Sequence, residues 1–238
     1  MAGICSQCGT QCLPIKRCSM CRQVNYCGVG CQRAAWQQHK ITCKPPPPSA
    51  LWTAAAEGSS EEVRHLLADR PDMEERGTSD QTTPLHVAAR QGHEQCVLML
   101  LENGADLVAN SRFRRTALHA ASAEGHVGTV RILLQHGADV SATSGFVSTA
   151  LHEAASSGQV EVLKLLLQHG AEVSPKDKNG LTPLHDAVLG DSDALGDAQV
   201  EAMRVLLEHG ADTSGVENGC GGETLLHWAT GQDANPKP

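Results

Sequence analysis

The residues with the most distinctive chemistry are cysteines arranged in close pairs at the start of the chain. Eight of the ten cysteines fall within residues 1–43, while Cys96 and Cys220 stand alone. Two C-x2-C pairs are followed by a C-x3-C pair and an H-x3-C pair. The eight paired donors are Cys5, Cys8, Cys18, Cys21, Cys27, Cys31, His39 and Cys43. Thiolate and imidazole donors at these spacings are typical of tetrahedral zinc sites, so the sequence predicts two structural Zn²⁺ ions.

Two other uses of the cysteines were weighed against structural zinc. A disulfide framework would require export, but the start "MAGICSQCGT" lacks the basic residues and apolar run of a signal peptide. We therefore expect an intracellular protein, cytoplasmic or nuclear, with reduced thiols. Catalytic zinc would need an open coordination position, which four protein ligands do not leave. Cys12 is a spare thiol, either a surface residue or a substitute ligand.

The order of these donors, together with Tyr26, Gln32, Trp36 and Lys40, resembles a MYND-type zinc finger over residues 5–43. The resemblance implies that the two zinc sites interleave along the chain. It assigns Cys5, Cys8, Cys27 and Cys31 to one zinc ion, and Cys18, Cys21, His39 and Cys43 to the other. Such a finger is small, and metal binding replaces the apolar core that about 44 residues cannot supply.

Gln32 and Trp36 fall in a segment, residues 29–38, that the composition predicts as a short helix. Four residues apart, they share one helix face. The MYND resemblance implies that they line a groove for proline-rich peptides, which bind aromatic surfaces in an already ordered conformation. The alternative is that Trp36 forms the small core of the finger.

The run "KPPPPS" follows the finger and is expected to form a stiff, extended spacer. Two other interpretations are a ligand for an aromatic groove of another protein and a ligand for Trp36 in a second copy of this chain.

Beyond this linker the chain repeats itself every 33 residues. "TPLHVAARQGHEQCVLMLLENGAD" begins at Thr83, and related segments begin at Thr116, Thr149 and Thr182. We expect each threonine to cap a first helix, a central glycine to turn the chain, and the glycine of "HGAD" to end a second helix. These motifs resemble ankyrin repeats over residues 81–214. The resemblance implies an α-solenoid with finger-like connections, so the fold class is mostly α, an ankyrin-repeat solenoid preceded by a small zinc-stabilised MYND finger.

The predicted domains are the finger at 1–44, the linker at 45–48 and the repeats at 49–238. Within the repeats we expect a degenerate first unit at 49–80, full units at 81–114, 115–147, 148–180 and 181–221, and a partial unit at 222–238. Trp52 occupies the repeated histidine position in the first unit. The unit at 181–221 carries a polar, acidic insertion, "GDSDALGDAQ", expected as a loop between its helices. The partial unit either caps the stack with Trp228 or frays.

The histidines are explained by the repeat rather than by catalysis. His86, His119, His152, His185 and His227 share one repeat position, where a structural hydrogen bond is expected. No nucleophile, base and orienting group recur together, and no phosphate-binding loop is present. We therefore expect a protein that is not an enzyme and has no small-molecule substrate. Cys96 is expected in the core, and Cys220, among glycines, is the more reactive thiol.

The two phenylalanines of the chain, Phe113 and Phe146, lie 33 residues apart in the finger segments. Stacked at one repeat position, they would form a ridge with Arg112, Arg114 and Arg115 beside it, and aromatic side chains with arginine are typical of binding hot spots. The alternative is that each ring packs on its own finger. Arg114 and Val147 stand where the ankyrin pattern expects glycine, which puts the local finger geometry in doubt.

Charge separates the two parts of the chain. Residues 1–44 carry six basic and no acidic residues, while the whole chain has a net charge of −8. Bound thiolates reduce the positive charge of the finger, and no recognition helix or aromatic stacking platform is present, so nucleic acid is the lesser expectation. No segment is apolar enough for a membrane helix.

The sequence thus predicts a non-enzymatic protein–protein interaction adaptor. Its ankyrin stack would bind one protein on its concave face and fingers, and its finger would recruit a second, proline-rich partner. The alternatives are a zinc-finger transcriptional regulator that contacts DNA and a module of the ubiquitin-ligase type, although the ligand spacing does not resemble RING.

Overall fold

A computed structural model describes residues 16–17, 25–26, 49–69, 71–77, 80–189 and 196–213. The chain divides into two units, one made mainly of residues 1–49 and the other of residues 50–76 and 80–238. The first unit contains two short strands, β1 (Lys16–Arg17) and β2 (Asn25–Tyr26). They pair antiparallel, with Lys16 opposite Tyr26 and Arg17 opposite Asn25.

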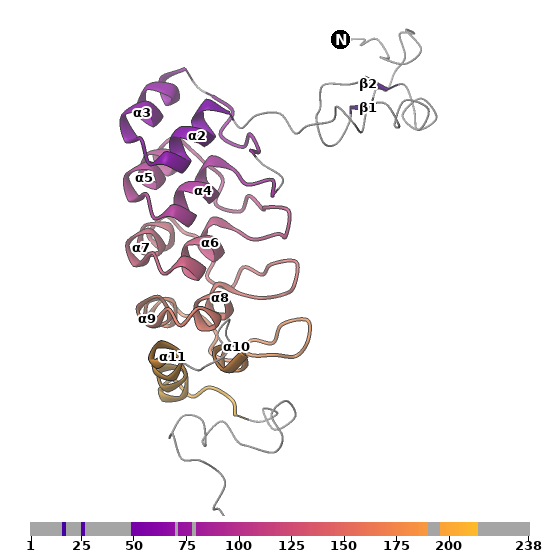
Figure 1. Cartoon of the computed structure of the whole chain (residues 1–238), viewed down its shortest axis with the longest axis vertical. Coiled ribbons are helices and arrows are strands. Elements are labelled where there is room, and N and C mark those ends of the chain that lie inside the picture. The colour runs from indigo at the N-terminus through magenta and orange to yellow at the C-terminus, as the bar shows by residue number, and fades with distance from the viewer. Residues whose placement is uncertain are drawn as a thin grey trace, which may run out of the picture. The chain divides into compact units, whose positions relative to one another are not determined.

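The second unit is built from helix pairs stacked in chain order (Figure 1). The first helices of the pairs are α2 (Ala50–Glu57), α4 (Pro84–Gln91), α6 (Ala117–Glu124), α8 (Ala150–Ser156) and α10 (Pro183–Leu189). The second helices are α3 (Ser60–Ala68), α5 (Glu94–Glu102), α7 (Val127–Gln135), α9 (Val160–Gln168) and α11 (Asp197–Glu208). First helices contact first helices of the neighbouring pair, and second helices contact second helices. The described chain is therefore mostly helical, and the predicted solenoid is confirmed.

Each full pair begins as the threonine pattern predicts. Thr116 precedes α6 in an extended conformation, and its side chain and that of His119 form a capping box. Capping boxes of the same composition precede α4 and α8. The turn after α6 is made by Gly125, whose φ of 79° lies in the left-handed region. The caps fix where each first helix starts and stops, and so set the spacing of the stack.

The second helices end on a side chain that reaches back along the helix. The Nδ1 atom of His136 lies 2.9 Å from the carbonyl oxygen of Ile132, four residues earlier. His169 and His209 make the same contact, at 2.9 and 2.8 Å. Each of these carbonyl oxygens also accepts the backbone N–H of the same histidine, so the side chain adds a second hydrogen bond at the end of the helix. The histidine of "HGAD" is therefore a C-terminal cap, followed by a left-handed glycine as the pattern predicts.

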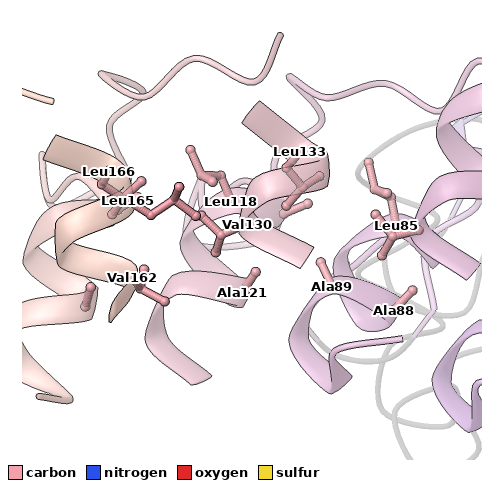
Figure 2. Close-up of a cluster of buried hydrophobic side chains, with 14 of the residues drawn as sticks. Leu85, Ala88, Ala89, Leu118, Ala121, Val130, Leu133, Val162, Leu165 and Leu166 are labelled. Atoms are coloured by element: carbon pink, nitrogen blue, oxygen red, sulfur yellow. The ribbon is translucent and has the colours of Figure 1, made fainter. Parts of the chain in front are cut away.

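The core runs through the stack as rows of equivalent residues (Figure 2). Leu85, Leu118, Leu151 and Leu184 recur at 33-residue intervals and are buried. Alanines on the same helices, such as Ala88 and Ala121, are also buried and let neighbouring first helices approach closely. Each buried leucine contributes roughly 1.5–3 kcal/mol by removal from water. Cys96 is buried in this core, as predicted.

The first unit of the stack differs from the others in sequence but not in architecture. Its helices α2 and α3 form a pair like the rest. Trp52 stands at the histidine position, and its Nε1–H donates to the Oγ1 atom of Thr82 in the next unit at 3.3 Å. The indole therefore links neighbouring units as the histidines do, which is consistent with the predicted degenerate repeat.

One predicted boundary was wrong. The acidic insertion was expected to be a loop through residue 199, but α11 begins at Asp197. An aspartate in the first turn interacts favourably with the helix dipole, which lets the insertion supply the start of the helix. Residues 190–195 lie outside the described residues.

Several other predictions also lie outside the described residues. They concern the eight zinc ligands, Cys12, Gln32, Trp36, the helix at 29–38, the linker, Cys220 and the partial unit at 222–238. Among the described residues, no helix is long and apolar enough to cross a membrane.

Candidate protein interface at the finger tips

The connections between helix pairs form fingers that end in tight turns. In the finger between α5 and α6, the N–H of Arg114 donates to the carbonyl of Ser111 at 2.9 Å, and the N–H of Ser111 donates to the carbonyl of Arg115 at 3.0 Å. This is the pattern of a type I turn followed by a left-handed residue. Phe113 stands at the third position of the turn, where a side chain projects from the tip.

The left-handed position recurs in four fingers with different residues. The φ angles are 54° at Gln81, 55° at Arg114, 62° at Val147 and 81° at Gly180. Glycine adopts this conformation without steric cost, whereas a β-branched residue is an outlier there. The sequence leaves the finger geometry in doubt, because Arg114 and Val147 stand where glycine is expected. The turn is nevertheless kept at both positions, at the expense of backbone strain.

The two phenylalanines stack on each other across neighbouring fingers. The ring centroids of Phe113 and Phe146 are 6.4 Å apart with 26° between the ring planes. The rings remain exposed, by 48% and 45% respectively. The alternative in which each ring packs on its own finger is therefore wrong. Backbone hydrogen bonds hold the tips together, since the N–H of Gly145 donates to the carbonyl of Phe113 at 2.8 Å.

A cation lies over each ring. The guanidinium carbon of Arg112 is 5.9 Å from the centroid of Phe113. The ammonium group of Lys178, on the next finger, is 3.9 Å from the centroid of Phe146. We call Arg112, Phe113, Arg114, Phe146, Val147 and Lys178 the finger-tip ridge.

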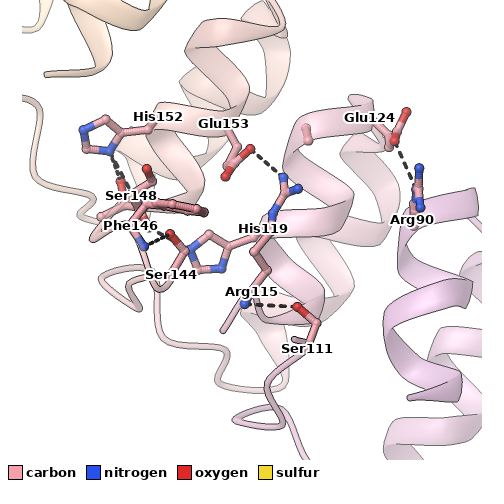
Figure 3. A network of polar contacts seen from close by, with 12 residues as sticks. Arg90, Ser111, Arg115, His119, Glu124, Ser144, Phe146, Ser148, His152 and Glu153 are labelled. Atoms are coloured by element: carbon pink, nitrogen blue, oxygen red, sulfur yellow. Dashed lines mark hydrogen bonds and ion pairs between the residues drawn. The ribbon is translucent and has the colours of Figure 1, made fainter. Parts of the chain in front are cut away.

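Arg115 does not belong to this ridge, contrary to the sequence expectation. Its guanidinium Nη2 lies 2.5 Å from Glu153 Oε2 on α8 (Figure 3). Burial raises the pKa of Glu153, and the nearby Arg115 opposes that rise. Arg115 points along the first helices because a partly buried carboxylate is within its reach.

Four exposed basic residues lie on or beside the ridge. Arg112, Arg114, Lys176 and Lys178 are exposed, and none has an ion pair with an acidic side chain of the described residues. Asp177 lies among them, but its Oδ1 accepts the N–H groups of Asn179 and Leu181, each at 2.8 Å. That carboxylate is engaged within its own turn, so the four cations remain available to an external acid.

A groove of about 420 Å³ lies between the finger that precedes α8 and the finger that precedes α10. Its lining combines apolar side chains, among them Val140, Val147 and Pro175, with hydroxyl groups and with one acidic and one basic residue, Glu172 and Lys176. Val147 is 44% exposed and is shared by the ridge and the groove. One ligand could therefore contact the ridge and the apolar side chains of the groove together.

The repeated histidines connect each helix pair to the finger that follows. The backbone N–H of Thr116 donates to His119 Nδ1 at 3.2 Å, and His119 Nε2 lies 3.0 Å from the carbonyl oxygen of Ser148. This pattern fits a neutral ring with its proton on Nε2. Burial lowers the pKa of His119 to about 4, and it lowers the pKa values of His86 and His152. These rings are structural links, as the sequence predicts.

Asp186 on α10 lies near two other carboxylates. Burial is the main cause that raises its pKa to about 7, and the charges of Asp177 and Glu153 add to the effect. No nearby cation offsets this in the way Arg115 does for Glu153. Of the described carboxyl groups, Asp186 therefore has the pKa furthest from its ordinary value.

Of the predicted zinc finger, the structure describes the strands β1 and β2. In the sequence, Cys18 and Cys21 fall between these strands, and Cys27 follows β2 directly. Within the described residues, no three histidine, cysteine or acidic side chains form a metal-sized cluster.

Comparison with known families agrees with both parts of the molecule. The model of ankyrin repeats (3 copies) matches residues 29–111, 51–144, 109–177 and 143–214. The chain belongs to the ankyrin repeat family. The model of the MYND finger matches residues 5–43, so the chain also contains a MYND finger.

Each of the similar proteins described next matches one short segment of this ankyrin repeat protein. "SET domain-containing protein 14" of Caenorhabditis elegans is 50% identical over 40 residues, 17% of this chain and 9% of that protein. "Oxysterol-binding protein-related protein 1" of Rattus norvegicus is 52% identical over 58 residues, 24% of this chain and 6% of that protein. "Tudor domain-containing protein 1" of Homo sapiens is 48% identical over 33 residues, 14% of this chain and 3% of that protein. The chain therefore spans a small fraction of the length of these relatives.

Ankyrin repeats and MYND fingers are modules of protein–protein interaction, and a MYND finger binds zinc. Both modules are typically non-catalytic. Lys178 and the exposed side of Val147 were not singled out as site residues from the sequence. A signal for Lys178 was present, because it stands 66 residues, two repeats, after Arg112.

Proposed function

We propose that this protein is a non-enzymatic adaptor that holds two protein partners at once. The ankyrin stack binds one partner through the finger-tip ridge and the adjoining concave face, and the MYND finger recruits a second, proline-rich partner through Gln32 and Trp36. The observation that supports this most directly is the exposed stack of Phe113 on Phe146, because exposed aromatic side chains flanked by cations are typical of binding hot spots.

Zinc has a structural part in this proposal. One ion is held by Cys5, Cys8, Cys27 and Cys31, and the second by Cys18, Cys21, His39 and Cys43. The donor set is suited to zinc because thiolates and imidazole bind it tetrahedrally with no need for redox chemistry. We place the protein inside the cell, cytoplasmic or nuclear, where such thiols stay reduced.

Proximity labelling in cells tests the adaptor function with the full chain. The variant Phe113→Ala/Phe146→Ala should lose one set of labelled proteins, and Trp36→Ala should lose a different set rich in proline motifs. Val108→Ala is the matched control for the ridge, because Val108 is 70% exposed but lies outside it. Identical sets for all four proteins would contradict the proposal.

The two alternatives give different results in simple assays. A DNA-binding regulator would show sequence preference with a steep dependence on salt. A ubiquitin-ligase module would transfer ubiquitin in vitro in a way that depends on the zinc ligands. The adaptor proposal expects neither activity.

A further inference from the structure

We propose that the finger-tip ridge binds an acidic segment of a partner protein that carries a large apolar side chain, and that Arg114 and Val147 determine this specificity. The inference rests on the proposed function of the ridge as a protein-binding surface. It adds the chemistry of the partner and names the residues that select it.

The charge around the ridge favours an acidic partner. Arg112, Arg114, Lys176 and Lys178 are exposed around the ridge and have no acidic partner among the described residues. The chain as a whole carries a net charge of −8. Exposed cations without an acidic partner attract an acidic segment, which gives both specificity and faster association.

The arrangement of the two rings favours a peptide over single-stranded nucleic acid. Bases bind such surfaces by stacking on a ring face. Here Phe113 and Phe146 stack on each other, and Arg112 and Lys178 lie over their rings. The ring edges and the groove beside them suit an aliphatic or aromatic side chain better than a flat base.

Val147 adopts a strained backbone conformation that glycine would adopt freely. Gly180 makes the same turn on the next finger, and a Cβ atom there would meet nothing within 4 Å. Glycine would therefore fit the turn at position 147 without strain, whereas valine at φ 62° costs about 1–2 kcal/mol. This conformation places the apolar side chain of Val147, which is 44% exposed, in the wall of the groove between the fingers that precede α8 and α10. Strain that produces an exposed apolar contact points to a ligand.

Arg114 stands at the same left-handed position on the finger before that of Val147. Its backbone has a φ of 55°, and its guanidinium is exposed at the tip. The two left-handed positions of the ridge thus carry one cation and one apolar side chain, the two features that an acidic, apolar segment would contact.

The test uses the full chain and a random library of displayed 12-residue peptides as the probe. Peptides enriched on the wild-type protein should be acidic and contain a leucine, isoleucine or phenylalanine. A labelled consensus peptide should bind Lys176→Glu/Lys178→Glu about tenfold more weakly, and its affinity should fall as salt rises. Arg131→Glu is the matched control, because Arg131 is exposed on α7 away from the fingers.

Val147→Gly and Arg114→Gly separate binding from folding. Each should bind the peptide about fivefold more weakly while melting at a higher temperature, since the turn loses its strain. A residue with a structural role alone could not give this combination. Weaker binding accompanied by a lower melting temperature would contradict the assignment of these two residues.

The outcomes distinguish this inference from the function on which it rests. Peptides that need Phe113 and Phe146 but are not acidic would overturn the inference and leave the ridge as a protein-binding site. Enriched peptides that bind Phe113→Ala/Phe146→Ala as well as wild type would overturn both. Binding of a labelled oligothymidine that Lys176→Glu/Lys178→Glu abolishes, without any acidic peptide, would assign the ridge to nucleic acid instead.

Discussion

At the scale of single residues, Val147 has the most informative backbone. Its φ of 62° places a β-branched side chain in a conformation that glycine adopts freely. The neighbouring turn shows the unstrained form, with Gly180 at the equivalent position. Val147→Gly and Gly180→Val therefore test the cost of this backbone conformation in opposite directions.

We expect Val147→Gly to raise the free energy of unfolding by about 1 kcal/mol, because relief of strain exceeds the added entropy of the unfolded chain. Gly180→Val should lower it by a similar amount, since the position has room for the side chain and only the backbone conformation is unfavourable. Urea denaturation of both variants measures these changes. Equal destabilisation by the two substitutions would show that Val147 packs in a way that outweighs its strain.

Asp186 provides a second prediction at this scale. Its pKa is raised to about 7, whereas a carboxyl group in the unfolded chain titrates near its ordinary value. The folded protein thus binds more protons than the unfolded one between these values, and Asp186 lowers stability as pH rises through that range.

We expect Asp186→Asn to stabilise the protein at pH 8 by roughly 1 kcal/mol after allowance for solvent screening, and to have less effect as pH falls toward 4. Thermal melts at several pH values measure the difference. A gain that is the same at pH 8 and pH 4.5 would show that the carboxylate is not the cause. Asp139→Asn, in the connection between α7 and α8, is a suitable control.

Residue positions were predictable from the sequence where the 33-residue period controls them. The period placed Phe113 and Phe146 at one position, and the apolar stripe of a second helix placed Cys96 in the core. It could not show which charged group each arginine would contact. Arg115 was expected beside the ridge but pairs with Glu153, 38 residues later in the chain, because that choice depends on side-chain reach across two helix pairs.

At the scale of elements, the start of each first helix depends on a threonine and a histidine that satisfy each other. Thr116 Oγ1 lies 2.8 Å from His119 Nδ1, and both residues are buried. Loss of the hydroxyl would leave a buried ring nitrogen with one fewer partner and remove a helix cap.

We expect Thr116→Val to lower the free energy of unfolding by about 1–2 kcal/mol, since valine keeps the shape and removes the hydroxyl. Thr143→Val is the control, because Thr143 is exposed on a finger. Chemical denaturation followed by circular dichroism measures both. A Thr116 variant as stable as the control would mean that the cap contributes nothing to the helix.

The histidine row also predicts a pH dependence. Burial lowers the pKa of His119 to about 4, and the nearby Arg115, His86 and His152 lower it further while its bond to Ser148 opposes them. Between pH 6.5 and 4 the unfolded chain binds a proton that the folded ring does not, so this residue lowers stability as pH falls. Asp186 acts in the opposite direction, so single variants must be compared.

We expect the stability of His119→Gln to fall less steeply than that of the wild type over this range, by up to about 1.4 kcal/mol per pH unit. Urea denaturation at pH 7.5, 6.0 and 5.0 gives the slopes. Parallel slopes would show that His119 is protonated in the folded protein as readily as in the unfolded one.

Elements were largely predictable because caps and glycines are local signals. Thr116 and Gly125 mark the two ends of α6 in the sequence itself. The start of α11 was not predicted, since its insertion has no threonine cap and no repeat from which to infer it. Asp197 belongs to a polar run whose composition is that of a loop.

At the scale of the whole molecule, the helix stack has an apolar core of its own. The buried cluster of the described residues runs from Leu51 to Ala211 and extends through all the helix pairs. The finger, by contrast, is too small to fold by apolar burial alone.

We expect a zinc chelator to increase hydrogen exchange in peptides from residues 1–44 and to leave those from α4 to α9 unchanged. Mass spectrometry of the full chain measures both regions in one sample, and metal released to a coloured chelator should amount to two ions per chain. Increased exchange throughout the helices would show that the finger supports the stack. A single zinc ion would contradict the interleaved pairing.

The order of modules along the chain was predictable because each has a sequence pattern that does not depend on distant contacts. The finger-tip ridge is different, since it exists through contacts between neighbouring units. Phe113 and Phe146 needed the fold to bring their rings within 6.4 Å.

The two rings belong to different helix pairs, and the backbone bond from Gly145 to Phe113 joins the same two fingers. A molecule that lies across both rings loses its binding site whenever the boundary between these pairs opens. By mass action it therefore makes that opening rarer. A partner bound to the ridge would therefore hold the two helix pairs together, so that repeats able to unfold one after another would instead unfold together.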